Sequence, residues 1–126
     1  MPDAADEPTI LLVEDEFLIR LSLSEALKDY GFAVIEADAA ADAMAILRSD
    51  VPIAILLTDI HLGKEVDGLD LARAAREIRP DLAVIYMTGR PRPEEFARHP
   101  PREIFIAKPF LPSELARLAR SLLATG

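Results

Sequence analysis

Short apolar runs alternate along this chain with segments whose apolar residues recur at helical spacing, and this alternation constrains the fold more than any other feature. Five runs have the length of strands, at residues 9–13, 32–37, 53–59, 82–88 and 103–107. Runs that are apolar almost throughout are typical of strands buried on both faces. Because strands joined by crossover helices pair in parallel, we predict an α/β fold: a doubly wound five-stranded parallel sheet with helices on both faces.

The intervals between these runs carry apolar residues three and four positions apart, which predicts helices. We expect Gly31 to end the first helix and Asp38 to cap the second. The interval at residues 89–103 holds four prolines, and an interior proline costs a helix about 3 kcal/mol. The fourth helix is therefore expected to be short or distorted, near residues 94–99. The final helix is expected to be regular, with Pro112 near its first turn.

Composition is that of one ordinary globular domain. The chain has 126 residues, of which 51% are hydrophobic and 29% charged, enough for one hydrophobic core. Residues 1–8 are polar and acidic, and we expect a flexible lead-in there, followed by one domain over residues 9–126. The absence of cysteine excludes disulfides, thiolate metal sites and cysteine catalysis.

Charge and hydropathy narrow the range of partners. The net charge is −8, which disfavours non-specific binding to nucleic acid and to anionic membranes. No apolar run approaches the ~20 residues that span a bilayer, and the N-terminus lacks the features of a signal peptide. We therefore expect a cytoplasmic chain with no direct nucleic-acid binding and no membrane association.

Charged and polar residues stand where the predicted strands end. Glu14 and Asp15 follow the first run, Asp59 and Thr88 end the third and fourth, and Lys108 follows the fifth. In open parallel sheets, ligands bind beyond the carboxyl ends of the strands. Three acids at one edge repel one another unless a cation intervenes, and oxygen ligands at a water-accessible site suit Mg²⁺. The set predicts a Mg²⁺ site with a pocket able to accept a phosphoryl group.

This set resembles the active site of the response regulator receiver domains of bacterial two-component signalling, and the resemblance extends over nearly the whole chain. It is carried by the acid pair after "ILLV", Asp59 after "AILLT", Thr88 in "VIYMTG" and Lys108 in "IAKPF". The resemblance implies the flavodoxin-like strand order 2-1-3-4-5. It also implies that Asp59 takes a phosphoryl group from a phosphohistidine on a histidine kinase or histidine phosphotransfer protein.

The resemblance further implies how the metal is held. Glu14, Asp15, Asp59 and the backbone carbonyl of His61 would bind Mg²⁺. The metal and Lys108 would neutralise charge on the transferring group, which is most of what phosphoryl transfer requires of a protein.

A switch is implied as well. Thr88 would hydrogen-bond a phosphoryl oxygen. Phe105, three residues before Lys108, matches the switch aromatic of the family, whose turning would change the partner-binding surface. A phenylalanine in a buried strand is also ordinary core, and this alternative stays open.

Two other functions are weighed against this one. A phosphohydrolase with an aspartyl-phosphate intermediate would carry "DxD" after its first strand, whereas Asp59 follows the third and His61 is its second neighbour. A phosphate-independent binding module would not need all five residue types. We expect a signalling domain that phosphorylates and dephosphorylates itself rather than a turnover enzyme.

The chain ends about one turn beyond the last helical stripe, so no output domain is expected here. A free-standing receiver and one excised from a longer protein both remain open, as do the cognate kinase, the downstream partner and the oligomeric state.

Overall fold

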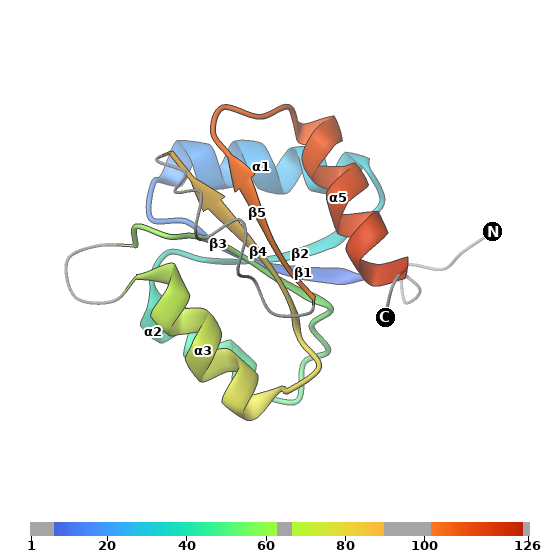
Figure 1. The fold of residues 1–126 in the computed structure, drawn as a ribbon. Helices are drawn as coiled ribbons and strands as arrows, with labels where there is room; N and C mark the ends of the chain where they lie inside the picture. Colours follow the sequence, from blue (N-terminus) through green and yellow to red (C-terminus); the bar gives the residue numbers. More distant parts are fainter. Residues whose placement is uncertain (1–6, 63–66, 90–101, 125–126) are drawn as a thin grey trace.

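The computed structural model describes residues 7–62, 67–89 and 102–124 (Figure 1). Within them the elements, in chain order, are β1 (Thr9–Val13), α1 (Phe17–Asp29), β2 (Ala33–Ala37), α2 (Ala40–Leu47), β3 (Ile55–Asp59), α3 (Gly68–Ile78), β4 (Ala83–Thr88), β5 (Glu103–Ala107) and α5 (Pro112–Ala124). The short fourth helix, expected near residues 94–99, and residues 1–6 of the expected lead-in lie outside the described residues.

All five strands form one parallel sheet in the order β2-β1-β3-β4-β5. This confirms the predicted fold class and the strand order implied by the resemblance. Every residue of the central strands β3 and β4 is buried, as the nearly unbroken apolar runs predicted. Because the strands run in the same direction, their carboxyl ends share one edge of the sheet.

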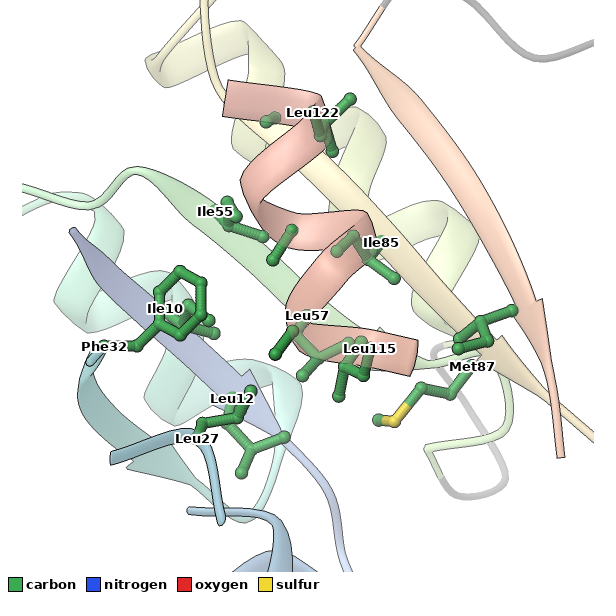
Figure 2. Packing of buried hydrophobic residues seen from close by; sticks show 14 residues of the cluster. Ile10, Leu12, Leu27, Phe32, Ile55, Leu57, Ile85, Met87, Leu115 and Leu122 are labelled. Atoms are coloured by element: carbon green, nitrogen blue, oxygen red, sulfur yellow. The ribbon is translucent and has the colours of Figure 1, made fainter. Parts of the chain in front are cut away.

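Helices cover both faces of the sheet, α1 and α5 on one and α2 and α3 on the other (Figure 1). Successive side chains of a strand point to opposite faces of the sheet, so each strand contributes residues to two hydrophobic cores. Figure 2 shows the core beneath α1 and α5, where Ile10, Leu57 and Ile85 pack with Leu27 and Leu115. The intervening residues of the same strands pack against α2 and α3.

The helix ends confirm some predictions and correct one. Gly31 follows α1 with a φ of 91°, a conformation that glycine adopts without strain, and α5 begins at Pro112 as expected. The prediction that Asp38 caps α2 is wrong. The N-cap is Ala39, with no side-chain hydrogen bond. Asp38 lies one residue before the cap, and its carboxyl interacts with the carboxyl of Asp42 in the first turn instead of with a backbone N–H of the helix.

Two other helix termini are stabilised by side-chain hydrogen bonds. Asp67 caps α3 by accepting a hydrogen bond from the Asp70 N–H at 2.8 Å. Arg79 donates to the carbonyls of Leu47 and Ser49, at 3.1 and 2.8 Å, and so closes the end of α2 from the end of α3. Among the described residues, no helix has the length and apolar character needed to cross a bilayer.

Candidate active site

The carboxyl ends of β1, β3, β4 and β5 bring the predicted residues to one edge of the sheet. Glu14 directly follows β1, Asp59 ends β3 and Thr88 ends β4, and all three are buried. Lys108 follows β5, and its N–H continues the ladder by donating to the Thr88 carbonyl at 2.8 Å. The backbone of the sheet therefore fixes the positions of these four residues.

Both oxygens of the Asp59 carboxylate have partners within the chain. The Lys108 ammonium forms an ion pair with Oδ2, and the His61 N–H donates to Oδ1 at 2.9 Å. Hydrogen bonds to a charged group are roughly twice as strong as neutral ones. Asp59 is thus held in one orientation, with its reactive oxygens at the rim of the sheet.

Glu14 is a buried carboxyl without a full set of partners. Its residue is 2% exposed, and Oε1 accepts only a long hydrogen bond, 3.3 Å from the Glu16 N–H. Oε2 has no hydrogen-bond donor among the described residues. Burial first, and then the charge of Asp59, raise the pKa of Glu14 to about 7, although the charge of Lys108 lowers it.

The other two predicted metal ligands lie at the surface. Asp15 is exposed and follows the buried Glu14 in the sequence, and the His61 side chain is exposed. Among the side chains that the structure describes, no group of three acids or histidines is arranged to hold a metal ion. The pair of Glu14 and Asp59 nonetheless fits a hard cation, because an unsatisfied buried carboxylate oxygen lies beside a second carboxylate.

Phe105 lies on β5 opposite Tyr86 of β4. The two rings stack with their centroids 4.6 Å apart and an interplanar angle of 27°. Phe105 is partly buried and packs against the core beneath α2 and α3. This contact is compatible with ordinary core and with a switch, so the switch role remains a prediction.

Sequence reasoning missed Gly68, the first residue of α3. Its N–H donates to the Ile60 carbonyl at 2.6 Å, and a Cβ at this position would lie 2.2 Å from the Asp59 carbonyl oxygen. The helix can therefore approach the backbone of Asp59 only because residue 68 has no side chain. The dipeptide of Asp67 and Gly68 was visible in the sequence as a loop signal, but the strand end that it contacts was not.

Comparison with known proteins identifies the family. A model of the family described as the response regulator receiver domain matches residues 10–120. The chain belongs to this family. The receiver domain is 32% identical to the sensor kinase CckA of Brucella abortus (strain 2308), in an alignment covering 96% of this chain and 13% of that kinase. It is 44% identical to the response regulator receiver protein CpdR of the same organism, over 64% of this chain and 65% of that protein.

A solved structure supports the same assignment. The crystal structure of a response regulator receiver protein from Sinorhizobium medicae WSM419 matches with a TM-score of 0.85 at 33% identity, covering 95% of this chain and 97% of that one. The receiver domain spans less than two thirds of the length of either of the two Brucella relatives. As a member of this family it is a phosphoacceptor signalling domain of two-component systems, and neither the phosphohydrolase nor the phosphate-independent binding module is favoured.

Proposed function

We propose that Asp59 accepts a phosphoryl group from a phosphohistidine on a histidine kinase or histidine phosphotransfer protein, in a Mg²⁺-dependent reaction that changes the partner-binding surface. The observation that carries the proposal is the arrangement around Asp59. One of its oxygens accepts from the His61 N–H, the other pairs with Lys108, and Glu14 lies beside it. A carboxylate held in this way is pre-positioned for attack, so little orientation remains to be lost in the transition state.

In the proposed transfer, an Asp59 oxygen attacks phosphorus while the P–N bond of the phosphohistidine breaks. The bonding pair returns to the imidazole nitrogen, and Asp59 gains the P–O bond of an acyl phosphate. Lys108 would leave the attacking oxygen and follow the charge onto the phosphoryl oxygens. Thr88, at the adjacent strand end, would donate a hydrogen bond to one of those oxygens.

Glu14, Asp15, Asp59 and the His61 carbonyl are the proposed Mg²⁺ ligands. The bound ion would neutralise charge on the phosphoryl oxygens. Support within the chain comes from Glu14, because its buried Oε2 has no hydrogen-bond donor among the described residues. A cation at this place would satisfy that oxygen and lower the pKa of the carboxyl.

An apolar groove beside Lys108 supports a protein as the phosphodonor. The groove has a volume of about 610 Å³ and lies between α1 and the start of α5, with Leu18, Leu23 and Phe110 in its wall. Next to it, Phe17 and Leu111 are 60% and 63% exposed. Grouped exposed apolar residues mark interaction sites. We propose that the partner's apolar surface docks here and brings its phosphohistidine to Asp59.

Intact-mass measurement after treatment with a small acyl-phosphate donor tests the proposal. We expect one phosphate-sized gain in the wild type, only with Mg²⁺, and none in Asp59→Asn. Asp70→Asn is a matched control, because Asp70 is an exposed acid in the first turn of α3, and it should gain mass like the wild type. A gain in Asp59→Asn, or a gain that persists with a metal chelator, contradicts the proposal. Rapid turnover of the donor with no stable phosphorylated species would instead indicate a hydrolase.

A further inference from the structure

A buried chain of polar contacts links α3 to the β4–β5 pair, away from Asp59. The hydroxyl of Tyr86, which is 3% exposed, donates to Glu103 Oε1 at 3.0 Å. Glu103 Oε2 pairs with Arg76 Nε at 3.2 Å, and Arg76 Nη2 donates to the Arg102 carbonyl at 3.1 Å. Burial, and then the charge of Glu103, raise the pKa of the Tyr86 hydroxyl, which keeps it a donor. These contacts hold the Tyr86 ring at its outer end.

The ring held in this way is the surface on which Phe105 stacks. Tyr86 and Phe105 are paired in the β4–β5 register, and their rings lie 4.6 Å apart at 27°. Stacking of this kind favours the stacked arrangement over an unstacked one by about two- to tenfold, in addition to the effect of the area that the rings bury. Movement of the Phe105 ring away from Tyr86 would therefore lose a contact of this size.

Satisfying one tyrosine hydroxyl does not require a partly buried ion pair. The side chains of Glu103 and Arg76 are 9% and 22% exposed, and removing two charges from water often offsets their mutual attraction. Stability alone therefore explains the pair poorly. Its clearest effect is geometric, because it fixes the orientation of Tyr86 and with it the surface beneath Phe105.

We propose that Glu103 is a positioning residue for the switch: by holding Tyr86 it keeps Phe105 stacked, and so stabilises the arrangement in which the Asp59 carboxylate pairs with Lys108. This inference rests on the proposed function and on the role of switch aromatic that the family resemblance implies for Phe105. The described arrangement goes with the free carboxylate, because both Asp59 oxygens are engaged within the chain. Lys108 contacts Asp59 and lies three residues after Phe105, so in this proposal a movement of Lys108 is transmitted to Phe105 along the backbone.

In this proposal, the polar contacts of Glu103 weaken the binding of a phosphoryl group at Asp59. A ligand's apparent affinity falls with the fraction of protein in the competent arrangement. If the Glu103 contacts favour the free-carboxylate arrangement, removing them must tighten the binding of a phosphoryl analogue. A purely structural role predicts the opposite or nothing, since a loosened fold does not bind more tightly.

Calorimetric titration with beryllofluoride in excess Mg²⁺ tests this coupling in the full chain. Tyr86→Phe removes the hydroxyl and keeps the ring, and Glu103→Met removes both contacts at similar volume. We expect each variant to bind two- to tenfold more tightly than the wild type. The double variant should bind no more tightly than Glu103→Met alone, because both changes break one chain. Tyr30→Phe is the control, since Tyr30 is exposed, and it should match the wild type.

Proton NMR gives the second readout. Nuclear Overhauser contacts between the Tyr86 and Phe105 rings should be strong in the wild type, weaker in Glu103→Met and lost on saturation with beryllofluoride. Unchanged or weaker affinity in both variants, with lowered thermal stability, overturns the inference and leaves the proposed function standing. A wild type that binds no beryllofluoride and gains no phosphate overturns the proposed function together with this inference.

Discussion

Substitution of Gly68 by alanine tests how closely α3 is docked on the strand that carries Asp59. A Cβ at residue 68 would lie 2.2 Å from the Asp59 carbonyl oxygen, and 3.0 Å from both the Asp59 carbonyl carbon and the Ile60 Cα. All three are backbone atoms, so no side-chain rotation relieves the contact. Ordinary van der Waals separation requires a shift of about 1 Å between the start of α3 and the end of β3.

The expected cost follows from that shift. Overpacking of this kind costs about 1–3 kcal/mol, and weakening the Gly68 N–H to Ile60 carbonyl bond, 2.6 Å long, adds about 1 kcal/mol. The better helix propensity of alanine offsets about 0.5–1 kcal/mol. We therefore expect Gly68→Ala to lower the free energy of unfolding by about 1–3.5 kcal/mol.

Urea denaturation measures the loss, with Gly89→Ala as the matched control. A Cβ at Gly89 would meet no described atom within 4 Å, so its free energy of unfolding should change by less than about 0.5 kcal/mol. Because misplacement of a reacting group by about 1 Å can cost about a hundredfold in rate, Gly68→Ala should also slow phosphorylation at least tenfold. Equal stability of the two variants, with phosphorylation at the wild-type rate, would refute the docking described here.

Two further predictions concern buried polar groups. Ser24 is fully buried in α1, and its hydroxyl has no hydrogen-bond partner among the described residues, so Ser24→Ala should raise the free energy of unfolding by about 1 kcal/mol. Exposed Ser22 of the same helix is the control, and an equal gain there would attribute the effect to helix propensity alone. The pKa of Tyr86 is raised in the folded state, so its contribution to stability is complete below pH ~10, the ordinary tyrosine value, and is lost as the pH rises toward its own pKa. Urea unfolding between pH 8 and 11 should show this loss in the wild type and a smaller one in Tyr86→Phe; equal slopes would contradict it.

Local pattern predicted the existence of the five strands because burial on both faces leaves a nearly unbroken apolar run, whereas their order in the sheet came from the resemblance to the family. It was less accurate at the starts of β2, β3 and β4, predicted at residues 32, 53 and 82. Phe32 and Leu82 are buried, but their N–H groups donate to the carbonyls of Leu27 and Arg79 and so close the turns that precede each strand. Burial and membership of a strand are separate properties, and hydropathy reports only the first.

The candidate site likewise has features that the sequence predicted and features that it did not. Parallel strands predict which residues share an edge, and the structure places Glu14, Asp59, Thr88 and Lys108 there. The sequence did not indicate that Glu14 is buried while its neighbour Asp15 is exposed, since this depends on how the chain turns after β1. The chain from Tyr86 to Glu103 was hidden for a further reason. It arises from the register of two strands separated by residues 89–102, and no local pattern encodes that register.

The charge balance at the edge connects the unpartnered Glu14 to the proposed chemistry. Glu14 and Asp59, when both are ionised, place two negative charges beside the single positive charge of Lys108. The net charge of these three groups is then negative, which opposes the approach of a phosphoryl group. Burial, and then the charge of Asp59, raise the pKa of Glu14 to about 7. A divalent cation offsets the negative charges of Glu14 and Asp59, so the edge no longer repels a phosphoryl group. A buried carboxyl that destabilises the fold in isolation is thereby explained, because its charge favours the binding of the ion on which the proposed transfer depends.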